Sequence, residues 1–548
     1  MGTGRSRARQ ARRARRSVGA VAGRIRRRLH QTLTKDEKES LGRWLVPASF
    51  VVALFVRLVG LGGSSMWLDE IMESLMAKGD LRQLFSSLIF DRAQPPVEPL
   101  LTWLLQHLGF GELARRVVNL LFVSGAIAIL ARWVRRRFGV ATAGLAALLL
   151  AVSPMLLRYS HELRPYALAL LFFCWALDAT DRWLTSDRSR FPLEITVAAG
   201  LASLTHYLAI AVWLPIAAAW WAERGRASGA SLPAWRLMLS PLVASLPLAF
   251  WFALLTTSTG PRWSLPVTHW SLVEVERRFR QLMLWGAGGQ EIPRYAVALF
   301  AVLLVTGLAL ASRRREGVVL SAGLVGGTIL VELALLAAGR FSHLRYNIYA
   351  LPFLFAAVAL GVVRLSSLVA RWKRVVGGLV GILLVAALVV PSLAADVEYA
   401  RHGRPDWPAI ARAVRALDGD AAEVAVSSPW AMISIGYYLD RYSSWPEAPQ
   451  GIELLQNDRN RLVAAVGRAT GCHLVLVAGG PLPSAEFVDG LRPKRPVLFL
   501  PDTDQARLFR FAGPETGKRS CFPPPDFRPE PTPGYGRLFP WLHSAPEG

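Results

Sequence analysis

Long apolar runs recur through most of this chain, and they constrain its fold more than any other feature. A helix needs about 17–25 apolar residues to cross the hydrocarbon core of a bilayer. Only 19% of the 548 residues are charged and 53% are hydrophobic, whereas a soluble domain carries roughly 25% charged residues. The sequence therefore predicts an α-helical polytopic membrane protein with about 11–13 spans. The runs are Leu45–Leu61, Val117–Leu130, Ala141–Leu157, Ala167–Leu177, Leu237–Leu255, Ala296–Ala311, Val318–Ala338, Ile348–Val363 and Val375–Val390.

The distribution of charge predicts which way the chain crosses the membrane. Residues 1–43 hold 14 Lys and Arg against 3 Asp and Glu, which indicates a basic cytoplasmic tail by the positive-inside rule. A basic tail can also bind nucleic acid, but this one adjoins an apolar run, so we expect membrane lipid and no nucleic acid as its partner. No cleavable signal peptide is expected before Leu45. We expect a multi-pass protein of the cell inner (plasma) membrane.

Two segments of the membrane region need particular interpretations to keep the spans alternating. Residues 62–111 contain one modest apolar stretch, Val97–Phe110, which we interpret as an interfacial helix inside an outer loop. Residues 193–222, which contain His206 and Tyr207, must fold as an out-and-back pair. Residues 44–393 then form one transmembrane domain.

The C-terminal residues 394–548 differ in composition and predict an extracytoplasmic α/β domain. Short strand-like runs alternate with helix-like stretches, and the segment Phe522–Pro540 is rich in Pro, which predicts an extended tail. The chain has three cysteines, too few for a Cys-rich metal site or disulfide framework. Cys472 and Cys521 could pair if this domain is extracytoplasmic, and no metal ligand set is expected from the lone histidines.

Several charged groups fall on the expected outer face, against the positive-inside rule. Such charges at a membrane boundary need another reason to be there, and guanidinium groups suit a phosphate. Asp69 and Glu70, just after the first span, admit two interpretations: acids that favour a helix N-terminus, or an acid–base or cation-holding pair. Gln94 faces the same compartment and could donate to a substrate oxygen. The outer-face cations are Arg115, Arg116, Arg158, Arg164, Arg340 and Arg345.

The order and spacing of these motifs resemble one family, the C-type (GT-C) integral membrane glycosyltransferases, in particular the protein O-mannosyltransferase and aminoarabinose transferase relatives. The resemblance covers roughly residues 44–440. It rests on Trp67-Leu68-Asp69-Glu70, Gln94-Pro95-Pro96, Arg158–Tyr166, Arg345-Tyr346 with Pro352, and Asp406-Trp407.

The resemblance implies transfer of a monosaccharide from a polyprenyl-phosphate donor to an acceptor hydroxyl on the outer face, with a catalytic outer loop at 62–111. It implies that Asp69 is the base and that Glu70 orients the acceptor or holds a cation, so a divalent cation stays open as a cofactor. Relatives usually have His or Lys where this chain has Gln94, which puts a phosphate-neutralising role there in doubt. The remaining substrate-binding positions that it implies are Arg116, Glu162, Arg164, Tyr166, Arg345 and Tyr346.

Physical chemistry makes this scheme coherent. A phosphate leaving group needs charge stabilisation, which arginines supply, and the attacking hydroxyl needs a base on the opposite side of the anomeric carbon. A single displacement would invert that centre. The alternatives are a lipid-linked glycan polymerase or ligase, and a transporter without chemistry, although paired repeats typical of transporters are not evident. The sequence leaves the sugar open, and the acceptor could be a protein, a lipid or a glycan.

Overall fold

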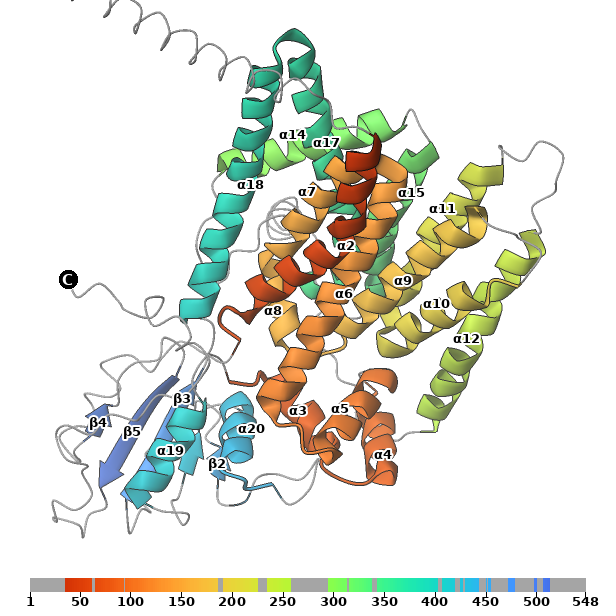
Figure 1. The fold of residues 1–548 in the computed structure, drawn as a ribbon. Coiled ribbons are helices and arrows are strands. Elements are labelled where there is room, and N and C mark those ends of the chain that lie inside the picture. Colours follow the sequence, from red (N-terminus) through yellow and green to blue (C-terminus); the bar gives the residue numbers. More distant parts are fainter. Residues whose placement is uncertain are drawn as a thin grey trace, which may run out of the picture.

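The computed structural model shows a helical bundle with a smaller group of helices and strands at one end (Figure 1). The Cys472–Cys521 pairing, Asp406 and the Pro-rich tail lie outside the residues whose side chains it describes. The described residues are 35–61, 65–92, 94–185, 191–224, 234–257, 294–312, 315–337, 343–402, 407–418, 424–426, 429–442, 450, 452–454, 472–478, 497–499 and 506–512.

Helices account for nearly all of the described chain before residue 419. In chain order, the first group is α2 (Lys35–Leu58), α3 (Leu68–Met76), α4 (Leu81–Asp91), α5 (Val97–His107), α6 (Glu112–Phe138), α7 (Val140–Ala151), α8 (Pro154–His161), α9 (Tyr166–Thr185), α10 (Leu193–Thr205), η1 (Tyr207–Val212), α11 (Trp213–Arg224) and α12 (Ala234–Thr256). The second group is α14 (Arg294–Ser312), α15 (Arg315–Val325), η3 (Gly326–Leu330), α16 (Val331–Ala337), η4 (Leu344–Ala350), α17 (Leu351–Trp372), α18 (Arg374–His402), α19 (Trp407–Asp418) and α20 (Pro429–Tyr438).

Six described helical segments are long and apolar enough to cross a membrane, or seven if the bent pair α7–α8 forms one span. This is fewer than the 11–13 spans expected from the sequence. The apolar runs are helical, but α2 and α10 have apolar parts of fewer than 18 residues, and α9 carries Asp178, Asp181 and Arg182. The six segments are Glu112–Phe138, Trp235–Thr256, Tyr295–Ser312, Glu316–Ala337, Leu344–Trp372 and Arg374–Val397.

The expected span at 140–157 is broken into α7 and α8, which are bent by 55°. Ser153 and Pro154 start α8 at this break, since Pro has no N–H and suits the first turn of a helix. The carbonyls left open at the end of α7 are bonded by Arg57, whose guanidinium donates to Leu150 O at 2.9 Å and to Ala151 O at 3.0 Å. The bend directs the chain after α8 toward α3.

The bundle is packed closely around α6, α7, α9 and α17. Helices α14 and α17 approach each other closely at small residues, because a Cβ on Gly307 of α14 would lie 1.9 Å from the backbone oxygen of Ala357 on α17. Such small-residue contacts are typical of helices that associate within membranes. Any larger residue at Gly307 would force the two helices apart.

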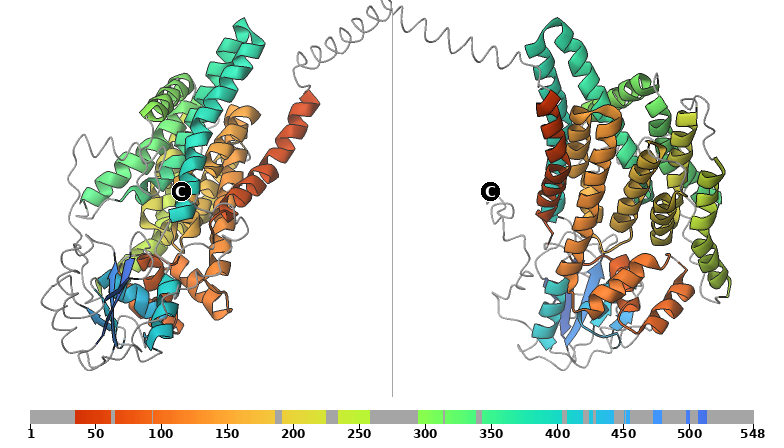
Figure 2. Two further views of the ribbon diagram at one scale, coloured as in Figure 1. Left: turned by 90° about the vertical axis from the view of Figure 1, so that its left-hand side faces the viewer. Right: turned by 45° about the vertical axis from the view of Figure 1, so that its right-hand side comes forward.

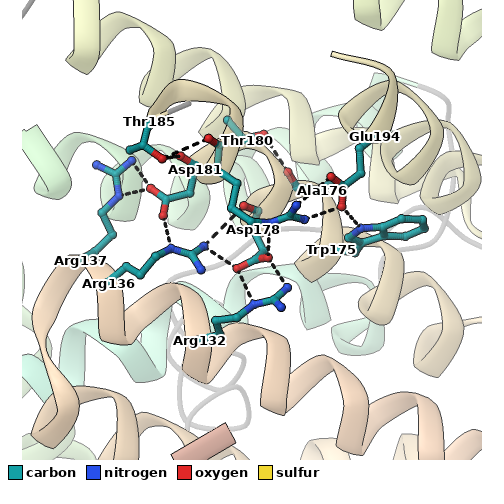
Figure 3. A network of polar contacts seen from close by, with 11 residues as sticks. Arg132, Arg136, Arg137, Trp175, Ala176, Asp178, Thr180, Asp181, Thr185 and Glu194 are labelled. Atoms are coloured by element: carbon teal, nitrogen blue, oxygen red, sulfur yellow. Dashed lines mark hydrogen bonds and ion pairs between the residues drawn. The ribbon is translucent and has the colours of Figure 1, made fainter. Parts of the chain in front are cut away.

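A network of ion pairs joins the last turns of α6 to α9 (Figure 3). Asp178 is fully buried and accepts bonds from Arg132, Arg136 and Arg182, and Asp181 accepts from Arg136 at 2.6 Å. A carboxylate taken out of water is tolerated only when it is paired, so the arginines at the end of α6 explain why α9 can hold two buried acids. The network fixes α6 against α9 at the end opposite to Arg115 and Arg116.

Helices α3, α4 and α5 gather at one end of the bundle, beside α20 and the strands (Figure 2). Each has about ten residues and is too short to cross a bilayer. Helix α5 is therefore not a membrane span, and its interfacial place in an outer loop stays a prediction.

Among the described residues of the C-terminal part, five strands form one sheet of order β2-β1-β3-β5-β4. They are β1 (Val424–Val426), β2 (Ile452–Leu454), β3 (Cys472–Ala478), β4 (Val497–Phe499) and β5 (Ala506–Ala512). Strand β1 pairs in parallel with β2 and β3, whereas β5 is antiparallel to β3 and β4. Most residues around these strands are outside the described part, so an α/β domain over 394–548 stays a prediction.

Candidate active site

Helix α3 presents two carboxylates on one face. Trp67 is extended and precedes the helix, and the Glu70 carboxylate at the third position accepts from the Trp67 backbone N–H at 2.6 Å, one half of a capping box. Asp69 and Glu73 are four residues apart and therefore lie on the same side of the helix. Their side chains meet arginines from two distant segments.

Asp69 is the point where those segments converge. Arg345 Nη1, from η4, lies 2.8 Å from Asp69 Oδ2. Arg164 Nη2, from the turn before α9, lies 3.9 Å from the same oxygen. The Asp69 side chain keeps 26% of its surface exposed, so the pair of guanidinium groups and this carboxylate are open to a ligand from one side.

Glu73 lies on the buried side of the cluster that Asp69, Arg164 and Arg345 form with it. Its Oε2 accepts from Arg164 Nη1 and from Gln94 Nε2, each at 3.2 Å, and its Oε1 lies 3.2 Å from Thr102 Oγ1. Only 1% of the Glu73 side chain is exposed. Arg164 therefore bridges the partly exposed carboxylate of Asp69 and the buried one of Glu73.

These surroundings shift the two carboxyl pKa values in opposite directions. Burial alone would raise the pKa of Asp69, but the guanidinium groups of Arg164 and Arg345 outweigh it and hold that pKa below its ordinary value. Burial raises the pKa of Glu73 to about 7, although Arg164, Gln94 and Thr102 oppose the shift. At neutral pH Asp69 is therefore ionised, whereas Glu73 is poised between its two forms.

Aromatic rings surround the Arg345 guanidinium on the bundle side. Its carbon Cζ lies 5.8 Å from the ring centre of Tyr166 and 5.5 Å from that of Tyr346, within the range of a cation–π contact. His206, at the break between α10 and η1, stacks on Tyr346 at 6.0 Å between ring centres. These rings fix the orientation of Arg345.

Two of the expected substrate-binding residues do not reach this cluster. Glu70 is fully buried, and its carboxylate accepts from the backbone N–H groups of Trp67 and Leu163, the latter at 2.7 Å. Arg116 is equally buried, and its Nη2 lies 2.7 Å from Glu112 Oε1 and 3.9 Å from Glu70 Oε1. In this structure both groups tie α3, α6 and the turn before α9 together.

Two other expected residues lie at the edge of the cluster. Gln94 is buried and donates to Glu73, so it contacts the carboxylate that holds Arg164. The Glu162 carboxylate lies 3.4 Å from Arg158 Nε, and the Glu162 backbone oxygen accepts from Asn119. The Arg158 guanidinium in turn sits 6.0 Å from the centre of the half-exposed Trp67 ring.

Glu73 is the residue that sequence reasoning missed. Its spacing of four from Asp69 on an amphipathic helix was the available signal, but nothing local showed that Arg164 would reach it. Among the described residues, no three His, Cys, Asp or Glu side chains gather as a metal-binding group.

Comparison with known proteins agrees with the motifs. Residues 93–251 match the family model described as dolichyl-phosphate-mannose-protein mannosyltransferase. The crystal structure of ArnT from Cupriavidus metallidurans in the apo state is 15% identical, with a TM-score of 0.53 over 85% of this chain and 97% of that one. The structure of the same protein bound to undecaprenyl phosphate is 14% identical, with a TM-score of 0.50 over 87% of this chain and 99% of that one. No curated protein sequence matches the chain.

The family match and the shared fold confirm the predicted resemblance to the C-type integral membrane glycosyltransferases. The described residues share the fold of ArnT, and several of their helices are long and apolar enough to cross a membrane.

Proposed function

We propose that this protein transfers a monosaccharide from a polyprenyl-phosphate donor to an acceptor hydroxyl at the outer face of the membrane, with inversion at the anomeric carbon. The observation that carries the proposal is the contact of Asp69 with both Arg345 and Arg164. It places a carboxylate, the expected base, beside two guanidinium groups that match a phosphate.

In the proposed reaction, Arg164 and Arg345 bind the donor phosphate and stabilise the charge that develops on it as the bond to the sugar breaks. Preorganised donors of this kind supply the largest share of many enzymes' rate enhancement. Asp69 accepts the proton of the acceptor hydroxyl, whose oxygen attacks the anomeric carbon from the side opposite the phosphate. The products are the glycosylated acceptor and the free lipid phosphate.

In the protein without donor, the Asp69 carboxylate is paired with Arg345. A phosphate that engages Arg345 and Arg164 competes with Asp69 for the same N–H groups. The carboxylate then loses its partner, and its pKa rises because the arginine charges that lowered it are shared with the phosphate. Donor binding therefore makes Asp69 a better base.

The comparisons support the lipid-linked donor. The ArnT structure of the same fold is described as bound to undecaprenyl phosphate, and the matched family model names a dolichyl-phosphate-linked mannose. By analogy, Tyr166 and Tyr346 border the donor, and Glu162 supports the turn that carries Arg164.

We also propose the orientation that the charges predict. Residues 1–43 form a cytoplasmic tail, residues 44–393 form the transmembrane domain with its catalytic loop at 62–111, and residues 394–548 form an extracytoplasmic domain. The position of α3–α5 beside α20 at one end of the bundle supports this arrangement, because the loop and the C-terminal segment must then share one side of the membrane.

The test is transfer by the purified full-length protein in lipid nanodiscs. Radiolabelled polyprenyl-phosphoryl monosaccharides are supplied in one set of reactions and a lipid diphosphate oligosaccharide in another, with cell-envelope extract as the acceptor source. We expect label to pass from the monophosphate donor alone, and the Asp69→Asn variant to lose about 100-fold or more of the rate.

The same variant separates the two assigned roles. Because Asn cannot pair with Arg345 as an anion, Asp69→Asn should bind the donor at least as tightly as the wild-type protein. Normal transfer by this variant, or transfer only from the diphosphate donor, would refute the proposal.

A further inference from the structure

The Glu73 carboxylate shares its neighbour Thr102 with a second buried acid, Glu98. Thr102 Oγ1 lies 3.2 Å from Glu73 Oε1 and 3.0 Å from Glu98 Oε1. A hydroxyl has one hydrogen to donate, so both contacts can be hydrogen bonds only if one of the two carboxyl groups is itself protonated. Glu98 is 3% exposed, and its Oε2 has no hydrogen-bond partner among the described residues.

The Glu73 carboxylate has both cations and another acid near it. Arg164 is the cation that touches Glu73, and Asp69 shares it on the outer side. Arg115, on α6, donates to Ser74, the next residue of α3, at 3.1 Å. On the side toward α20, Tyr437 packs against the apolar cluster that contains Met66, Ile71 and Leu75. Arg164 is thus shared by Asp69 and Glu73, whereas Arg345 contacts Asp69. A buried carboxylate that loses its cation must take up a proton.

We propose that Glu73 is a positioning residue that holds Arg164 in the free protein and takes up a proton from water when a phosphodiester engages that guanidinium. The phosphodiester anion then replaces the Glu73 carboxylate as the partner of Arg164, and the carboxylate becomes a neutral carboxylic acid. Donor binding and proton uptake are therefore linked, and the buried pair of Glu73 and Glu98 keeps the site from accumulating negative charge. This inference rests on the phosphate role given above to Arg164.

The raised pKa of Glu73, about 7 in the free protein, sets the range in which the linkage is visible. Above that pH the free protein holds Glu73 as a carboxylate, so binding must draw a proton from solution. By linkage, the dissociation constant should then rise about tenfold for each pH unit above about pH 7, until the pKa of the bound state is reached.

The experiment measures binding of the monomethyl ester of undecaprenyl phosphate, which is a phosphodiester, to the full-length protein in nanodiscs, between about pH 6 and pH 9. This probe carries a single charge throughout, so its own titration does not contribute. We expect the wild-type affinity to fall as the pH rises, the Glu73→Gln variant to bind with little pH dependence, and Glu73→Asp to restore part of it. Glu112→Gln removes a nearby acid that contacts Arg116 and not Arg164, and it should keep the wild-type slope.

A second measurement does not depend on any variant folding. In weakly buffered solution at about pH 8, an indicator dye should record the uptake of close to one proton per probe bound by the wild-type protein. Binding with no proton uptake, or a Glu73→Gln variant with the wild-type slope, would overturn the inference while leaving the phosphate site intact. Absence of binding by every protein at every pH would overturn the phosphate site and the inference together.

Discussion

Arg345 Nη1 lies 2.8 Å from Asp69 Oδ2, although the two residues are 276 positions apart in the chain. The contact joins η4, which precedes α17, to the first turn of α3. Neither segment alone forms a site, because one supplies only a cation and the other only acids. Their meeting brings the expected base to the expected phosphate-binding group.

Replacement of Arg345 should weaken donor binding more than it weakens the fold. A hydrogen bond to a charged group contributes about 1.5–3 kcal/mol, so Arg345→Ala should raise the dissociation constant for a polyprenyl phosphate about tenfold or more. Arg345→Lys keeps the charge but loses the planar fork of the guanidinium group. Its dissociation constant should therefore lie between those of the wild-type protein and Arg345→Ala. Arg371→Ala, at an exposed position at the end of α17, is the control. Equal affinities for Arg345→Ala and Arg371→Ala would contradict the phosphate role.

Tyr438 should affect catalysis although it lies outside the cluster. Its hydroxyl accepts from the backbone N–H of Met66 at 2.8 Å and donates to Glu112 at 3.4 Å. Tyr438→Phe leaves the buried Met66 N–H without its partner, which costs about 1–3 kcal/mol and loosens the start of α3, three residues before Asp69. We expect a lower melting temperature and a lower kcat with little change in donor affinity.

The matched control for Tyr438 is in the same interface. Lys78, just after α3, and Asp440, just after α20, form an ion pair of 3.0 Å, but both side chains are exposed. Such a pair contributes about 0–1 kcal/mol, so Lys78→Ala should leave melting temperature and kcat nearly unchanged. If both variants behave alike, α20 does not position Asp69.

The network at the far end of α6 and α9 should matter for stability alone. Asp178→Asn removes the buried anion shared by Arg132, Arg136 and Arg182, and a hydrogen bond to a charged group contributes about 1.5–3 kcal/mol. We expect a clear loss of thermal stability in detergent, measured by the loss of monodisperse protein on heating. The protein that stays folded should bind the donor with wild-type affinity, since the network lies at the opposite end of both helices. A change in affinity without a loss of stability would count against this interpretation.

The stability of the free protein should depend on pH through Glu73. Its pKa is raised from 4.5 to about 7 by burial, so the folded state binds more protons than the unfolded state between these values. The contribution is fully present below about pH 4.5 and is lost as the pH rises to about 7, by roughly 3 kcal/mol at most. Relative to Glu73→Gln, the wild-type protein should therefore lose thermal stability between about pH 4.5 and pH 7. Parallel curves for the two proteins would show that Glu73 does not titrate in this range.

Some positions in the site followed from sequence pattern, and others did not. Asp69, Arg164 and Arg345 were expected to meet because all three follow apolar runs on the same expected side of the membrane, and the structure brings them together. Glu70 and Arg116 were expected beside them, but their side chains turn inward, toward backbone N–H groups and Glu112. Glu73 was not expected, since its importance comes from Arg164, 91 residues away.

The sequence by itself determined that this is a helical membrane protein and in which order its charged motifs occur. Apolar runs and the sign of the charges between them are local properties, and each run becomes a helix because hydrocarbon leaves backbone groups no other partner. Only the tertiary structure decided how many of those helices are long enough to cross a bilayer, and which carboxylate faces which guanidinium. Those outcomes depend on where helices break and how side chains are buried against distant segments, and no local pattern encodes them.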